Sequence, residues 1–64
     1  MDAVSLTEYM LKHLREKKAD YGQMLTNGTI ENMEDYRFIV GQIRGLQYCE
    51  DELRSAMKGI IHDD

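Results

Sequence analysis

Two histidines and one cysteine are the side chains in this sequence best suited to ligate a metal or to act as nucleophiles. His13, Cys49 and His62 are widely separated and form no C-x-x-C or H-x-x-x-H motif. Paired carboxylates for acid–base catalysis need an enclosing pocket, so we expect the acidic run at residues 50–52 to be solvated. The sequence therefore predicts a protein that is not an enzyme and has no catalytic residues, no metal site, no cofactor and no small-molecule substrate.

The size of the chain limits how it can be stabilised. Its 64 residues allow a single domain, residues 1–64, and a chain this short buries only about 60% of the surface that its unfolded form exposes. The hydrophobic fraction is 42%, the charged fraction is 31% and proline is absent, which favours an ordered, helix-rich chain. A single cysteine excludes an intrachain disulfide, so stability has to come from regular helix packing or from partner subunits.

The charge of the chain narrows the choice of partner. A net charge of −4 disfavours general nucleic-acid binding. One basic cluster, residues 12–18, is either a solvated helix surface or a docking site for an acidic partner. No apolar run approaches the roughly 18 residues of a membrane span, and no basic, apolar leader follows Met1. We therefore expect a protein of the cytoplasm in which it is made, with no membrane partner.

The apolar periodicity of the first half predicts one helix with clear ends. The segment SLTE, residues 5–8, fits a capping box, which places the first helical residue at Leu6. Asn27 and Gly28 supply a stop, because glycine adopts a left-handed conformation without a steric cost.

The second half predicts another helix, which folds back on the first. Thr29 and Asn32 could both cap it, and Asn32 is preferred because acidic residues follow in the first turn. No strand pattern competes with this interpretation. The predicted fold class is all-α, an antiparallel two-helix hairpin with helices at about residues 6–26 and 33–60.

Apolar residues at 3–4 spacing predict the core of this hairpin. The seam of the second helix is narrow and coiled-coil-like, with Glu50 as a polar member, while Lys17 and Lys18 interrupt the arc of the first helix. If the numbers of facing positions add to roughly 59, Met10 lies near Glu50. The predicted core consists of Met10, Leu14, Tyr21, Leu25, Tyr36, Ile39, Ile43, Leu46 and Leu53.

Gly41 and Gly45 lie inside the predicted second helix, where each costs roughly 1 kcal/mol relative to alanine. A local kink or simple tolerance is one explanation, and a bound anion is the weakest because mid-helix amides are already hydrogen-bonded. The third is another helix packed closely against a strip of small residues on the face away from the first helix. This strip and the uncovered end of the second helix form the predicted interaction site, which comprises Phe38, Gly41, Gly45, Cys49, Ala56, Met57 and Ile60.

Residues 33–53, MEDYRFIVGQIRGLQYCEDEL, resemble a stretch found in small helical proteins of tailed bacteriophages. An acidic helix start, a Tyr-Arg pair and an apolar-Gly-x-apolar-Arg-Gly-Leu core carry the resemblance. Such proteins are encoded among virion-assembly genes and have no assigned catalytic activity, so the resemblance implies a small structural or assembly component. The matching positions, which it implies are packing residues, are Tyr36, Gly41, Arg44, Gly45 and Leu46.

Together these features predict a non-catalytic structural or assembly protein that acts by helix packing, as a homo-oligomer or on a larger protein assembly. In a phage it would be a minor virion or head-to-tail assembly component, found in the host cytoplasm or in the virion. The alternative is a small phage-encoded inhibitor or adaptor that binds a host enzyme or defence protein through an exposed helix face. The same heptads would also allow the hairpin to open and exchange helices between chains.

Overall fold

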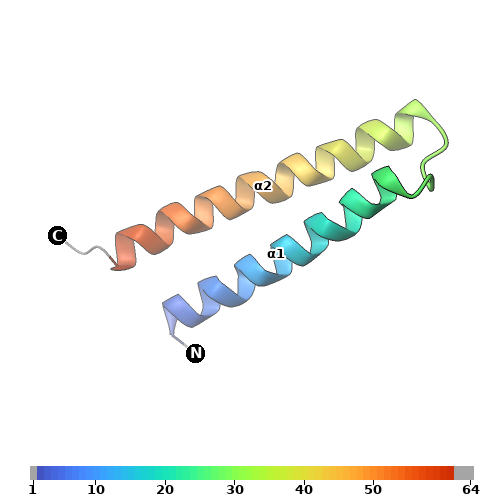
Figure 1. Cartoon of the computed structure of the whole chain (residues 1–64). Helices are drawn as coiled ribbons and strands as arrows, with labels where there is room; N and C mark the ends of the chain where they lie inside the picture. Colours follow the sequence, from blue (N-terminus) through green and yellow to red (C-terminus); the bar gives the residue numbers. More distant parts are fainter. Residues whose placement is uncertain (1, 62–64) are drawn as a thin grey trace.

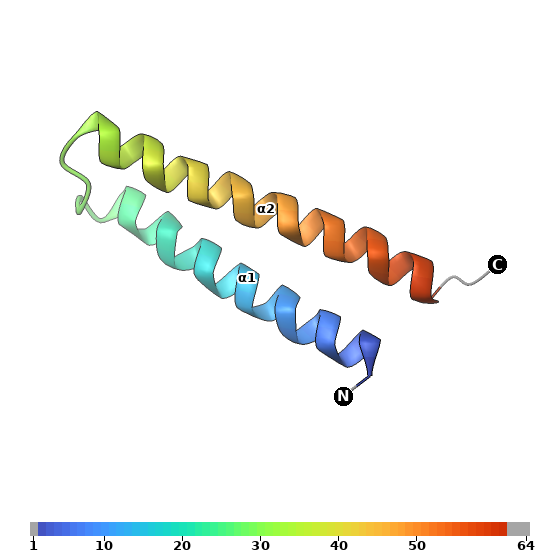
Figure 2. The ribbon, with the colours of Figure 1, turned by 180° about the vertical axis from the view of Figure 1, so that it is seen from behind.

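The computed structural model describes the backbone of residues 2–61 and the side chains of residues 2–59. It contains two α-helices, α1 (Ala3–Thr26) and α2 (Met33–Ile61), joined by residues 27–32. The helices lie side by side and antiparallel, with the turn at one end and the start of α1 near the end of α2 at the other (Figures 1 and 2). No strand occurs in the described residues, so the predicted all-α helical hairpin is confirmed.

The first helix begins earlier than the sequence predicted, because Asp2 rather than Ser5 is its N-cap. The Asp2 carboxylate accepts a hydrogen bond from the Ser5 amide at 2.7 Å, and the Asp2 carbonyl accepts one from the Leu6 amide at 3.0 Å. Aspartate caps a helix as well as serine does, and the earlier start adds most of a turn, so Ser5 lies inside the helix. The Ser5 amide also lowers the pKa of the Asp2 carboxyl below its ordinary value.

Asparagine side chains hold both ends of the turn. α1 ends at Thr26 with Asn27 as its C-cap, and Gly28 follows with a φ of +79°, in the left-handed region that glycine favours. The Asn27 side-chain oxygen accepts a hydrogen bond from the Thr29 amide at 3.0 Å. At the other end, the Asn32 side-chain oxygen accepts one from the Asp35 amide at 2.8 Å. The predicted stop at Asn27 and Gly28 and the predicted start at Asn32 are both confirmed.

The two helices meet along one narrow stripe. Leu11 and Ile39 are the only apolar side chains of residues 2–59 that are buried. Thr7 is buried one turn before Leu11, and its hydroxyl donates to the Ala3 carbonyl at 2.8 Å. The other predicted core residues that the structure places at this contact are half-buried at its edges: Leu14, Tyr21, Leu25, Ile43, Leu46 and Leu53.

The prediction that Met10 and Tyr36 belong to the core is wrong, because both side chains are exposed. At about 100° per residue, Met10 lies more than a quarter of a turn round the helix from Leu11. The predicted arc counted apolar residues alone and was therefore centred towards Met10, whereas Thr7 and Leu11 mark the observed centre. Tyr36 lies on the flank of α2 in the same way, about 60° from Ile39.

The hairpin is long and thin. Its Cα atoms span 49 × 18 × 14 Å and have a radius of gyration of 14.8 Å. A compact domain of the same length has a radius of gyration of about 11 Å. Each helix has one neighbour within the chain, so most of its circumference faces outward.

Two glycine substitutions test the backbone of this fold in opposite directions. Gly28→Ala should lower the free energy of unfolding by about 1 kcal/mol, because alanine is strained at positive φ. Gly41→Ala should raise it by about 1 kcal/mol, because alanine favours a helix interior and a Cβ there meets nothing within 4 Å. Urea unfolding followed by circular dichroism measures both. A destabilising Gly41→Ala would show that α2 is strained or closely covered at this position.

Candidate protein-interaction site

The best-buried side chain of residues 2–59 is a carboxylate. Glu50 exposes only 1% of its side chain, so the expectation that residues 50–52 form a solvated acidic run is wrong at this position. The Glu50 Oε2 atom lies 2.9 Å from the Lys18 Nζ atom, and the Glu50 Oε1 atom lies 3.7 Å from the Arg15 Nε atom. Arg54 adds a third cation, with its Nη1 atom 4.0 Å from Oε2. A buried carboxylate needs this compensation, because its desolvation costs several kcal/mol.

Polar neighbours extend the cluster towards solvent. The Lys18 Nζ atom also donates to the Gln47 Oε1 atom at 2.5 Å. Gln47 in turn donates from Nε2 to the Asp51 Oδ1 atom at 3.0 Å, and Arg54 pairs with the same oxygen at 3.9 Å. Among the buried side-chain nitrogens and oxygens of residues 2–59, the Glu50 Oε1 atom alone has no hydrogen-bond partner, so Arg15 stabilises it by charge and not by a hydrogen bond. We call the side of the hairpin that carries Arg15, Lys18, Gln47, Glu50, Asp51 and Arg54 the polar face.

Glu50 meets Lys18 and Arg15, whose numbers add with 50 to 68 and 65 and not to the roughly 59 that the sequence predicted, and the direction of helical side chains accounts for part of this difference. Side chains on a helix point back towards its N-terminus. On antiparallel helices, the sum of the residue numbers of two contacting side chains therefore exceeds the sum for two backbone positions that face each other. The predicted neighbourhood of Met10 and Glu50 is wrong, because Glu50 contacts Lys18 and Arg15, further along α1.

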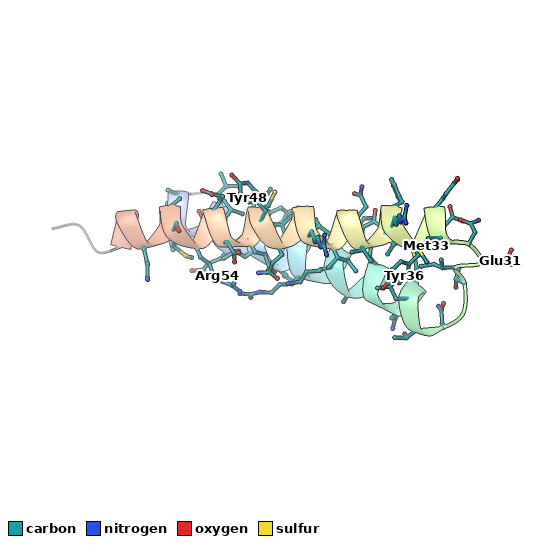
Figure 3. The ribbon with its side chains drawn as sticks, turned by 90° about the horizontal axis from the view of Figure 1, so that it is seen from above. Glu31, Met33, Tyr36, Tyr48 and Arg54 are labelled. Carbon is teal, nitrogen blue, oxygen red and sulfur yellow. The ribbon has the colours of Figure 1, made fainter. Side chains whose placement is uncertain are left out.

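The opposite side of the hairpin carries exposed apolar side chains, with His13 and Lys17 among those of α1. Figure 3 looks onto α2 with α1 behind it and shows Arg54 and Tyr36 on one side of α2, with Tyr48 on the other. At about 100° per residue, Phe38 lies well round the helix from Arg54, away from the polar face. Its side chain is 60% exposed, and on α1 Leu6 and Met10 are 50% and 41% exposed. We call this side the apolar face: Leu6, Met10 and Met24 of α1 with Phe38, Gly45, Cys49 and Ala56 of α2.

The structure places the predicted interaction residues in three groups. Five of them are exposed on α2: Phe38, Gly41, Gly45, Cys49 and Ala56. Met57, expected at an uncovered end, is half-buried in line with Ile39, because α1 starts at Ala3 and reaches this level. The side chain of Ile60 lies outside the described residues, as does His62.

Contacts within the hairpin do not account for the two central glycines. α2 continues without interruption across Gly41 and Gly45, so neither glycine breaks the helix. A Cβ added at either position meets nothing within 4 Å, so neither is needed for an approach to α1. Their cost in helix propensity is therefore not offset by anything in the described chain.

Sequence reasoning missed the Lys18–Glu50 pair, although a signal was present. Each residue interrupts the apolar seam of its own helix, and the two have opposite charges. A buried polar position on one helix needs a partner on the other. Two interruptions of opposite charge were therefore evidence for a contact between them.

The basic cluster of α1 has partners within the chain. Arg15 and Lys18 surround Glu50, and Lys17 lies over the ring of Tyr21 with its Nζ atom 5.7 Å from the ring centre. His13 packs against Tyr9 with the two rings tilted by 51° and 4.3 Å between their centroids. These contacts favour a structural explanation of the cluster over a docking site for an acidic partner.

Two further properties concern the part of the chain that the structure describes. No three His, Cys, Asp or Glu side chains there are grouped so that they could hold a metal ion. Neither helix combines the length and the hydropathy that crossing a membrane requires.

Fold and site together define a two-helix antiparallel hairpin with a buried ion cluster on one side and an exposed apolar surface on the other. No protein-family model, curated protein or solved structure matches this chain.

A double-mutant cycle tests the buried ion cluster. Lys18→Met should lower the free energy of unfolding by about 2 kcal/mol, because it leaves the Glu50 carboxylate buried without its closest cation. Adding Glu50→Leu should restore at least wild-type stability, because an apolar pair packs there without desolvating a charge. Urea unfolding measures each variant, and Lys12→Met, at an exposed position of the same helix, is the matched control. A double variant less stable than Lys18→Met would contradict this account of Glu50.

Proposed function

We propose that this protein is a non-catalytic structural protein, the subunit of a homo-oligomeric helical assembly held together by its apolar face. One observation carries the proposal: the hairpin leaves too much surface exposed for its size. Its solvent-accessible surface is 5077 Å², whereas a compact monomer of 7.5 kDa exposes about 4,200 Å². The excess of about 800 Å² equals what one partner contributes to a protein–protein interface of standard size.

The composition of the apolar face supports the same proposal. Large apolar side chains exposed on one side of a soluble protein favour an interaction site there. Here Leu6 and Met10 near the start of α1 and Phe38 near the turn are exposed on one side of the molecule, towards its two ends. Gly45 and Cys49 lie between them on α2 and leave room for the backbone of another helix to approach. A second layer of helices on this face would also supply the core that a two-helix chain lacks.

The finer assignment depends on the resemblance of residues 33–53 to small helical proteins of tailed phages. On that ground we propose a minor virion or head-to-tail assembly component, made in the host cytoplasm. Detection of the chain in purified particles would support this assignment, and its consistent absence from them would contradict it.

The native mass in solution, with and without a charge on the apolar face, tests the proposed function. We expect light scattering on a sizing column, at micromolar concentration with reductant, to give a discrete multiple of 7.5 kDa. Phe38→Lys should weaken association at least tenfold, because a charge would be desolvated in the interface. Met33→Lys is the matched control, since Met33 is also an exposed apolar residue of α2 but lies towards the polar face.

A wild-type protein that stays at 7.5 kDa would overturn self-assembly as the function. Equal loss of association in the two lysine variants would instead show that the apolar face is not the contact.

A further inference from the structure

We propose that Asn27 and Gly28 form a self-modification site, at which the Asn27 side chain loses its amide in the folded hairpin and becomes aspartate or isoaspartate. The two residues lie in the turn between α1 and α2 (Figure 1). The inference does not depend on the proposed function, because the reaction needs only this chain and water.

The reaction joins the Asn27 side chain to the backbone of the next residue. The Gly28 nitrogen loses its proton to base in the solvent and forms a bond to the Asn27 Cγ atom. The Cγ–Nδ2 bond breaks, and Nδ2 takes up a proton from water and leaves as ammonia, which gives a five-membered cyclic imide. Water then opens the ring at either carbonyl carbon. Cleavage between Cγ and the Gly28 nitrogen gives aspartate, and cleavage between the main-chain carbon and that nitrogen gives isoaspartate.

Gly28 is suited to attack the Asn27 side chain. It has no Cβ that would hinder the approach of its nitrogen to Cγ, and the space around its Cα is open, since a Cβ built there meets nothing within 4 Å. The Gly28 amide donates no hydrogen bond within residues 2–59, so the attacking nitrogen is not held elsewhere. Both residues are exposed, and solvent base and water therefore reach them.

The folded turn holds the two reacting atoms apart until it opens. With ψ of Asn27 at 6°, the Gly28 nitrogen eclipses the Asn27 nitrogen, whereas ring closure requires it to lie close to Cβ. The Asn27 side chain is also clasped, because its Oδ1 atom accepts hydrogen bonds from the Thr29 amide, at 3.0 Å, and from the Thr29 hydroxyl. The reaction therefore requires rotation about the Asn27 Cα–C bond and release of this clasp.

This opening is confined to the turn. Residues 27–29 are exposed and belong to neither helix, whereas the buried contact between Lys18 and Glu50 lies on the helices. Segments with few buried contacts open at a lower free energy than the whole fold. The turn thus reaches the reactive geometry while the helices stay packed.

The modification weakens the end of α1. It places a negative charge at the C-terminal end of the helix, where the helix dipole disfavours one. Isoaspartate also adds one carbon to the main chain directly after the Asn27 amide, which donates to the Gln23 carbonyl at 2.9 Å. We expect the isoaspartate form to unfold at a lower urea concentration than the unmodified chain, and an unchanged midpoint would contradict this part of the proposal.

The two asparagines of the sequence provide the test of the site. The full chain is kept in neutral buffer and digested at intervals, and mass spectrometry follows both positions. We expect Asn27 to react at least about tenfold faster than Asn32, because the Met33 side chain hinders ring closure at Asn32 whereas Gly28 has none. Asn32 is a matched control, since it is also exposed and its Oδ1 atom also accepts a backbone hydrogen bond. Equal rates, or aspartate without isoaspartate at position 27, would overturn the cyclic route.

Two variants test the part played by the folded turn. Thr29→Val removes the hydroxyl donor of the clasp and should speed the reaction about fivefold in buffer, but not in denaturing urea, where the clasp is absent. Lys18→Met destabilises the whole hairpin and should leave the rate in buffer unchanged, because the required opening is local. Circular dichroism establishes that each variant is helical before incubation.

Either variant can contradict the proposal. A slower reaction of Thr29→Val in buffer would show that the clasp does not restrain the turn. A rate that rises in Lys18→Met in step with its unfolded fraction would place the reaction in the unfolded chain and refute a site of the folded hairpin. The native mass of the protein, which decides the proposed function, has no bearing on either result.

Discussion

Two helices share only one line of contact, and this constraint determines the rest of the structure. Each helix can bury a single stripe against the other, so Leu11 and Ile39 are the only buried apolar side chains of residues 2–59. Apolar residues outside the stripe have no second helix within the chain to pack against. Leu6, Met10, Met24 and Phe38 are exposed for this reason and not because the sequence lacks amphipathicity.

The centre of that stripe is polar, which makes the hairpin more specific than its few buried leucines and isoleucines suggest. A seam of Leu and Ile alone would tolerate a shift by one heptad, because similar side chains would replace one another. A buried carboxylate does not tolerate such a shift. Moving Glu50 by a heptad would separate it from Lys18 and Arg15 and leave a buried charge without compensation. The ion cluster therefore sets which turn of α1 faces which turn of α2.

Local signals made most of the fold predictable from the sequence, and contacts between helices made the rest unpredictable. The stop at Gly28 and the start at Asn32 follow from residue chemistry that acts within four positions. The prediction of Ser5 as the N-cap was wrong because Asp2 and Ser5 are both good caps. The choice between them depends on whether most of a further turn of helix forms before Leu6. The predictions that Met10 lies in the core and beside Glu50 were wrong because apolar periodicity cannot identify a polar residue at the centre of a contact.

The short connection, residues 27–32, determines whether a chain folds before it can associate with another chain. Loops of this size close in roughly 10–100 ns, and a helical hairpin forms within microseconds to milliseconds. At micromolar concentration, association rate constants of about 10⁵–10⁷ M⁻¹s⁻¹ would bring two chains together only about once per second. A chain of the proposed assembly would therefore be a finished hairpin, with Glu50 already paired to Lys18 and Arg15, before it met a second chain. Exchange of helices between chains would require that hairpin to reopen first, so the turn acts as a kinetic barrier to domain swapping.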